Sequence, residues 1–141
     1  VSMLDIVIMA AGKGTRMKSS RPKVLHSLAG RALLQHVLAT AAGLGAQRVI
    51  TVTGHGAEQV EAAMRAALPE APLAFVRQEP QLGTGHAVQQ AVPQLGDAGT
   101  TLILNGDTPL IEAATARALV EASGGTRLAL LTIELPDPSG Y

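Results

Sequence analysis

The sequence predicts a single α/β domain with a mostly parallel sheet and helices on both faces. Short apolar runs that suit strands alternate with segments whose apolar residues recur at helical spacing. A chain of 141 residues, 47% of them hydrophobic, is also long enough to bury one core. Alternating strands and helices imply right-handed crossovers, which bring the carboxyl ends of the strands to one edge of the sheet. Ligands of such Rossmann-like sheets bind at that edge.

The individual elements follow from the apolar pattern in chain order. Residues 5–10 form an apolar, β-branched run that ends at Gly12, which is typical of a strand buried on both faces. Residues 33–42 predict a helix that stops near Gly43 and Gly45. The remaining segments alternate in the same way, with strands expected at 48–53, 73–77, 101–104 and 127–135, and helices at 57–68, 83–92 and 112–122.

Composition excludes several classes of partner and site. Eleven basic residues balance eleven acidic ones, and Phe75 and Tyr141 are the only aromatics, so neither a charged nor a stacking surface for nucleic acid is expected. The apolar run at 6–11 is too short for a membrane span and lacks the basic flank of a signal peptide. Zero cysteines exclude disulfides and thiolate metal sites and fit a reducing compartment, so we expect a cytoplasmic location and no membrane partner.

A glycine-rich loop follows the first strand. Small residues in the run Ala10 to Met17 allow successive backbone N–H groups to approach phosphate oxygens closely. The loop is not a Walker motif, because Val7 stands at the first glycine position and Gly14 replaces the required Ser or Thr. It is not a dinucleotide fingerprint either, because Met17 stands at the third glycine position.

Two cations accompany this loop. Arg16 offers a planar donor fork that suits outer phosphates, and Lys23 adds a compact charge after Pro22. We therefore interpret the segment as a phosphate cradle. The alternative is a plain strand-to-helix turn, with both cations merely solvated.

A polar loop after the strand at 73–77 suits a nucleobase. The Gln78 amide offers one donor and one acceptor, but because it can flip, it accepts uracil or cytosine equally by itself. A fixed backbone N–H, expected at Gly83, has to decide between the two bases. The alternative is a polar loop that leads into a helix with Thr84 near its N-cap. His86 lies close in sequence without an evident catalytic partner and is given no role.

Asp107 follows Gly106 directly after the strand at 101–104. A carboxylate there suits Mg²⁺, which takes one or two protein carboxylates and keeps waters and substrate phosphates as its other ligands. The alternative is a capping or Asx-turn role beside Thr108 and Pro109. The four histidines lack the spacing of a metal-binding pair.

These motifs together resemble the N-terminal part of the bifunctional bacterial family of N-acetylglucosamine-1-phosphate uridylyltransferase/glucosamine-1-phosphate acetyltransferases. The resemblance runs nearly end to end. It rests on the loop AAGKGTRM at 10–17, PKVLH at 22–26, QLGTGHA at 81–87, the pair Gly106 and Asp107, and DPSGY at 137–141. The loop and Pro-Lys occur in many sugar nucleotidyltransferases, whereas QLGTGHA and DPSGY are more specific.

The resemblance implies a fold of the nucleotide-diphospho-sugar transferase type and a role for each matching residue. Phosphates would be contacted by Gly14, Arg16 and Lys23, and Mg²⁺ by Asp107. Asn105 and Gly140 would contact the sugar, although Asn105 stands where well-known members have Tyr. Uridine would be held by Ala10, Ala11, Gly12, Gln78, Gly83 and Thr84.

The reaction implied is formation of UDP-N-acetylglucosamine and pyrophosphate from UTP and N-acetylglucosamine-1-phosphate, for cell-wall precursors of peptidoglycan and lipopolysaccharide. A phosphate oxygen of the sugar phosphate would attack the α-phosphorus in line, with Arg16 and Lys23 as the catalytic cations. Two alternatives stay open: a sibling transferase of different base or sugar specificity, and a nucleotide-binding module without catalysis.

The resemblance also bears on domain organisation. Residues 1–141 match the N-terminal part of the uridylyltransferase domain. The family's second metal ligand, an Asn, lies beyond Tyr141, as do its remaining sugar-binding residues and its acetyltransferase β-helix domain. We therefore expect the parent protein to be a homotrimer and these 141 residues to be a monomer. The sequence does not predict whether the isolated chain is active.

Overall fold

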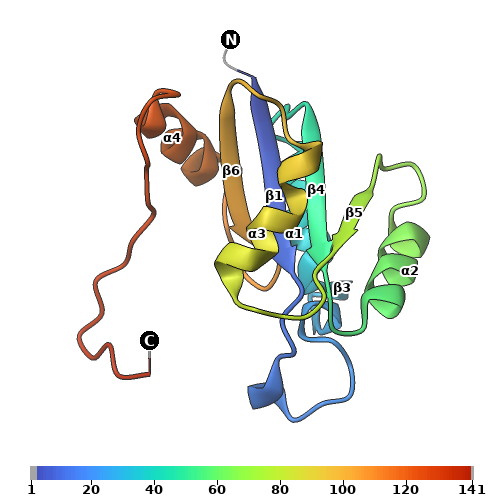
Figure 1. Cartoon of the computed structure of the whole chain (residues 1–141). Helices are drawn as coiled ribbons and strands as arrows, with labels where there is room; N and C mark the ends of the chain where they lie inside the picture. Colours follow the sequence, from blue (N-terminus) through green and yellow to red (C-terminus); the bar gives the residue numbers. More distant parts are fainter. Residues whose placement is uncertain (1–2, 141) are drawn as a thin grey trace.

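Four parallel strands form the central sheet of the computed structural model, which describes residues 3–140 (Figure 1). The strands lie in the order β5-β4-β1-β6, with bounds β1 Leu4–Ala10, β4 Arg48–Thr53, β5 Ala74–Arg77 and β6 Thr100–Asn105. A two-stranded hairpin, β2 Ser27–Leu28 and β3 Arg31–Ala32, precedes the first helix. The helices are α1 Leu33–Ala42, α2 Ala57–Ala67, α3 Thr84–Ala91 and α4 Ala113–Ser123. Three-residue 3-10 turns lie at Thr15–Met17, Lys23–Leu25 and Val92–Gln94.

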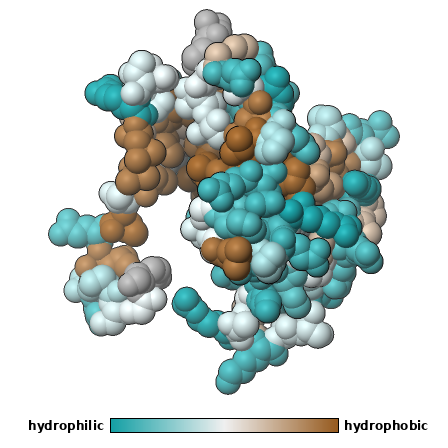
Figure 2. Space-filling model, in the orientation of Figure 1, coloured by the Kyte–Doolittle hydropathy of each residue, from teal (hydrophilic) through white to brown (hydrophobic). Residues whose placement is uncertain are grey.

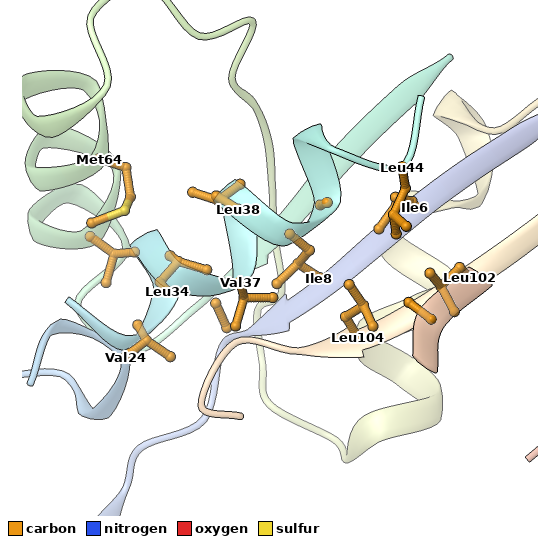
Figure 3. Close-up of a cluster of buried hydrophobic side chains, with 14 of the residues drawn as sticks. Ile6, Ile8, Val24, Leu34, Val37, Leu38, Leu44, Met64, Leu102 and Leu104 are labelled. Carbon is orange, nitrogen blue, oxygen red and sulfur yellow. The ribbon is translucent and has the colours of Figure 1, made fainter. Parts of the chain in front are cut away.

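Helices cover both faces of the sheet. On one face, Ile6 and Ile8 of β1 pack in a cluster with buried residues of α1, α2 and α4 such as Leu34 and Met64 (Figure 3). On the other face, the neighbouring β1 residue Val7 packs in a cluster with buried residues of β4 and α3. Because alternate residues of a strand point to opposite faces, a strand covered on both faces needs a continuous apolar run, and residues 6–10 of β1 supply it. The predicted α/β fold class is therefore confirmed.

The register of the sheet brings four chain segments to one edge. Ala10 pairs with Thr53, Thr53 with Arg77, and Met9 with Asn105, all in parallel strands. The segments that follow these strands therefore leave the sheet on the same side. They contain the glycine-rich loop, the loop after β4, Gln78 and Asp107, which are the segments that carry most of the predicted site.

The strand predicted at 127–135 is wrong. This segment runs outside the sheet as an extended tail, and Leu128 and Ile133 are 87% and 80% exposed. Strand-like residues form a strand only where their N–H and C=O groups find a partner, and within residues 3–140 the segment pairs with none. A groove of about 1010 Å³ separates the tail from β6 and α4. Apolar side chains line both of its sides (Figure 2).

The other predicted elements are confirmed within two residues of their ends. The helix predicted at 83–92 begins later, because Gly83 has φ +102°, and ends earlier, where Val92 and Pro93 start a 3-10 turn. The hairpin of β2 and β3, whose turn places Ala29 and Gly30 at positive φ, was not predicted from the sequence. No helix within the described residues is long and apolar enough to cross a membrane.

Candidate nucleotide site

The candidate site is assembled by backbone hydrogen bonds between the segments that follow the strands. The Gly106 N–H donates to the Met9 carbonyl at 2.8 Å, and the His55 N–H donates to the Ala11 carbonyl at 3.2 Å. The Gln78 N–H donates to the Thr53 carbonyl at 2.7 Å. These bonds continue the sheet pairing past the strand ends, so the start of each loop is held in the frame of the sheet.

Glycines let these segments approach closely. A Cβ on Gly54 would lie 2.9 Å from Ala11 Cβ, and one on Gly106 would lie 3.2 Å from Ala10 Cβ. Ala10 and Ala11 are in turn only 3% and 4% exposed. Their methyl groups are thus used in packing, and only their backbone is left to contact a ligand.

The middle of the glycine-rich loop is open to solvent. Gly12 is exposed, and a Cβ placed on it would meet nothing within 4 Å. Gly14 adopts φ +60°, and a Cβ there would lie 2.6 Å from the Cβ of Lys23. Arg16 is exposed on the 3-10 turn that follows Gly14. The loop thus lies against the stem of Lys23, so two of the three predicted phosphate-binding residues are in contact.

Lys23 also joins the glycine-rich loop to the predicted metal ligand. Its Nζ lies 2.5 Å from Oδ2 of Asp107, and the two side chains are 40% and 31% exposed. The cap alternative for Asp107 is wrong, because Glu112 is the N-cap of α4 and no side chain caps this helix. The predicted phosphate-binding cation and the predicted metal ligand are therefore direct neighbours.

Asp107 fits the requirements of a divalent cation. Its carboxylate is a hard oxygen ligand, partly exposed at the edge of the sheet, with the partly exposed ammonium group of Lys23 as its ion-pair partner. No cluster of three or more His, Asp or Glu side chains able to hold a metal occurs between residues 3 and 140. A site with one carboxylate suits Mg²⁺, which completes its shell with water and substrate oxygens.

The predicted base-binding residue Gln78 is buried, with only 4% of its surface exposed. Its Nε2 donates to the Gly83 carbonyl at 2.9 Å, which closes the loop between β5 and α3. Gly83 and Thr84 are exposed at the start of α3, where Gly83 is the N-cap and Thr84 is the first helical residue, as the alternative of a polar loop leading into a helix expected. A cavity of about 430 Å³ borders Gln78 together with Gly54, Gly56 and Arg77.

An ion pair that the sequence analysis missed supports this part of the site. Arg77, directly before Gln78, donates to Glu61 of α2 from Nε and from its second terminal nitrogen, both at 3.2 Å. The hydroxyl of Thr53 donates to the same carboxylate at 2.9 Å. These bonds, foremost the one from Arg77, hold the pKa of Glu61 below its ordinary value of 4.5. No sequence pattern identified these contacts, because Thr53, Glu61 and Arg77 lie on three different elements.

The two predicted sugar-binding residues are not brought together. Asn105 is exposed at the end of β6, and its carbonyl accepts a 2.9 Å hydrogen bond from the hydroxyl of Thr108. Gly140 belongs to the extended tail after α4, which runs apart from the sheet (Figure 1). Tyr141, the last residue of the DPSGY motif, lies outside the described residues.

His86, which the sequence analysis left without a role, also contacts the site. Its Nδ1 lies 3.0 Å from Nε2 of Gln78. The position of His86 in the first turn of the helix after the base loop is the sequence signal that could have identified it, because a side chain there faces back toward the loop.

Comparison with protein families identifies a MobA-like NTP transferase domain over residues 6–134. The curated protein "Bifunctional protein GlmU" of Methylibium petroleiphilum is 89% identical over 139 residues. The alignment covers 99% of this chain but 30% of that protein, so the chain spans about a third of its relative's length.

Two solved structures share the fold at higher divergence. HddC from Yersinia pseudotuberculosis, solved as a complex with GMP-PN, is 28% identical with a TM-score of 0.71 over 86% of this chain and 54% of HddC. Rv0371C of Mycobacterium tuberculosis H37Rv, solved as a complex with manganese, is 25% identical with a TM-score of 0.67. That match covers 89% of this chain and 61% of the other. Similar sheets in other proteins are thus known with a nucleotide analogue and with a divalent metal.

Proposed function

Because the chain belongs to the MobA-like NTP transferase domain family, we propose that it binds UTP for transfer of a uridylyl group to N-acetylglucosamine-1-phosphate. The observation that supports this proposal is the grouping of three features at one edge of the sheet. These features are the glycine-rich loop, the ion pair of Lys23 with Asp107, and the buried amide of Gln78. The glycine-rich loop and Lys23 follow β1, Gln78 follows β5 and Asp107 follows β6. Together they offer partners for phosphates, a divalent cation and a base.

In the proposed reaction, a phosphate oxygen of the sugar phosphate forms a bond to the α-phosphorus of UTP. The bond from that phosphorus to the oxygen bridging to the β-phosphate breaks, and pyrophosphate leaves. Such transfers need positioned charge rather than a nucleophilic side chain. Lys23, Arg16 and the N–H groups of the loop bind the phosphates and stabilise their developing charge.

Asp107 would hold the divalent cation, which we propose to be Mg²⁺. When bound, the cation supplies positive charge to the phosphate oxygens. We propose that the cation displaces the ammonium group of Lys23 from Asp107, which makes this group available to a phosphate. The two residues thus exchange one shared interaction for two separate ligand contacts.

We propose roles for the remaining predicted residues in the same complex. The backbone of Ala10, Ala11 and Gly12 would bind the nucleoside, and Gly83 and Thr84 would flank the base beside Gln78. Asn105 and Gly140 would contact the sugar. For Gly140 this contact requires the tail to move toward the edge of the sheet.

The wider assignments are also proposals. Residues 1–141 would form the N-terminal part of a uridylyltransferase domain in a longer, homotrimeric cytoplasmic protein of cell-wall precursor synthesis, and the isolated chain would be a monomer. Their support is the 89% identity to a bifunctional relative of which the chain covers 30%. Light scattering on this chain tests the monomer.

The test of the activity is pyrophosphate release by this chain with UTP, Mg²⁺ and N-acetylglucosamine-1-phosphate, beside a titration of UTP binding. Release with UTP bound in preference to CTP and GTP supports the proposal. Preference for another nucleotide supports a sibling transferase instead.

Binding without release supports a second candidate, a nucleotide-binding module without catalysis. The observation that favours this candidate is the place of Gly140 in the tail, apart from the other predicted residues. Absence of both binding and release refutes the nucleotide site.

A further inference from the structure

The buried amide of Gln78 has only one atom free for a ligand. Its Nε2 carries two hydrogens, and two acceptors lie within reach: the Gly83 carbonyl at 2.9 Å and Nδ1 of His86 at 3.0 Å. Both hydrogens are therefore used inside the protein. The remaining polar atom is Oε1, which can only accept a hydrogen bond.

The Gly83 carbonyl decides which way the amide points. Turning the amide over would place Oε1 against the Gly83 carbonyl oxygen, two acceptors with no hydrogen between them. With Nε2 fixed as the donor, Nδ1 of His86 has to be the acceptor. The neutral ring therefore carries its proton on Nε2.

Gln90 does not compete with Gln78 for His86. Its Nε2 lies 3.2 Å from Nε2 of His86, but also 3.1 Å from the backbone carbonyl of His86. A neutral imidazole has one acceptor nitrogen, and we assign it to Gln78, because this amide is buried away from water whereas the partly buried Gln90 can donate its other hydrogen to solvent. The amide of Gln90 therefore donates to the carbonyl, one turn earlier in α3.

We propose that His86 is a positioning residue that sets the base preference of the site. By accepting the second hydrogen of Gln78, it presents Oε1 alone to the base. An acceptor there favours a base whose ring nitrogen carries a hydrogen, as in uracil, over a base whose ring nitrogen is itself an acceptor, as in cytosine. The inference rests on the proposed nucleotide function. It adds that the choice between uracil and cytosine depends on His86, which contacts Gln78 rather than the base.

The size of the effect follows from the hydrogen bonds involved. Accepting cytosine requires the amide to turn, which breaks the bonds to Gly83 and His86 together. Removing the His86 acceptor leaves the Gly83 bond as the only restraint. Loss of one such bond should reduce the preference for UTP over CTP by about three- to tenfold.

The test compares equilibrium dissociation constants of UTP and CTP for the wild-type chain, His86→Leu and His86→Asn. Leucine removes the acceptor, whereas the Oδ1 of asparagine supplies one near the position of Nδ1. We expect the ratio of the two constants to fall about three- to tenfold in His86→Leu and to stay within about twofold of wild type in His86→Asn. Circular dichroism establishes that both variants fold.

A second measurement needs neither a variant nor a nucleotide. A long-range ¹H–¹⁵N spectrum of the labelled wild-type chain in alkaline buffer reports the tautomer of His86, which we expect to carry its proton on Nε2. A proton on Nδ1 overturns the inference, even where His86→Leu fails to fold.

The outcomes distinguish a failure of the inference about His86 from a failure of the proposed nucleotide-binding function. An unchanged ratio in His86→Leu, with wild-type preference for UTP intact, overturns the inference and leaves the proposed function standing. A wild-type chain that binds neither nucleotide overturns both.

Discussion

Replacing Lys23 by methionine tests the phosphate side of the site directly. Methionine removes the ammonium group but keeps an unbranched stem of similar shape. This stem matters because Gly14 lies against it, with the site of its missing Cβ 2.6 Å from the Cβ of Lys23. The substitution therefore separates the charge of Lys23 from its packing.

Two magnitudes follow from the structure. The ion pair of Lys23 with Asp107 is partly exposed, at 40% and 31%, so its loss should cost less than about 1 kcal/mol of folding free energy. For a chain of this size that is a fall in Tm of at most about 4 °C. A charge-assisted hydrogen bond to a phosphate contributes about 1.5–3 kcal/mol, so UTP affinity should fall by about 10- to 150-fold.

The assay pairs calorimetric titration of UTP in Mg²⁺ with thermal unfolding monitored by circular dichroism. Lys18→Met is the matched control, because Lys18 follows the same 3-10 turn but takes part in none of the ion pairs found among residues 3–140. It should leave affinity within about twofold. Equal UTP affinity in wild type and Lys23→Met refutes the phosphate role. A fall in Tm beyond about 10 °C refutes the view that the pair adds little to stability.

Three further predictions concern the loop, the supporting ion pair and the metal. Gly14→Ala should lower the free energy of unfolding by at least about 1–2 kcal/mol in urea titrations, because φ is +60° at this position. Gly12→Ala should change it by no more than about 0.5 kcal/mol. Equal effects of the two substitutions would contradict the left-handed conformation of Gly14. The free energy of unfolding of the wild type should decline as pH falls below about 4.5, because the unfolded chain protonates Glu61 before the folded chain does. Glu61→Gln should lose less unfolding free energy over that range. The same fall in urea midpoint for wild type and variant would contradict this. Chelation of divalent cations by EDTA should weaken UTP binding by the wild type and have a much smaller effect on Asp107→Asn. An equal loss of UTP affinity in both proteins would place the metal away from Asp107.

The central part of the fold could be predicted from the sequence because its signals are local. Residues 6–10 are apolar at every position, a pattern typical of a strand buried on both faces, and β1 confirms it. The end of the first helix at Ala42, before Gly43, likewise follows from neighbouring residues. The order of the strands had no such signal, because crossovers of similar length permit several neighbours for β1.

The wrong strand at 127–135 shows where local signals fail. Leu128, Leu130 and Ile133 have the composition of a strand, but a strand needs a partner at its edge. Pairing depends on chain that lies elsewhere in sequence, so local propensity cannot supply it. In the described residues, β6 pairs with β1 on one side and faces the apolar groove on the other.

The sequence allowed the edge of the sheet that carries most of the predicted site residues to be predicted, but not the contacts between these residues. The rule that loops meet at the carboxyl ends of parallel strands correctly grouped Gly12, Gln78 and Asp107 at one edge. The rule gives no side-chain directions, so the pairing of Lys23 with Asp107 and the contact of His86 with Gln78 were missed. Both depend on rotamers that only the folded surroundings determine.

Burial divides the candidate site into two halves with different tasks. Gln78 is 4% exposed and fully hydrogen-bonded at Nε2, so its geometry is set before a ligand arrives, and preorganised groups of this kind discriminate between ligands. Lys23 and Asp107 are partly exposed and neutralise each other, so they must rearrange on binding and respond to salt. Selectivity should therefore reside in the half next to Gln78, whereas the half around Lys23 supplies affinity for any triphosphate. This division would suit the proposed transfer reaction, which has to select one base and then release charged products.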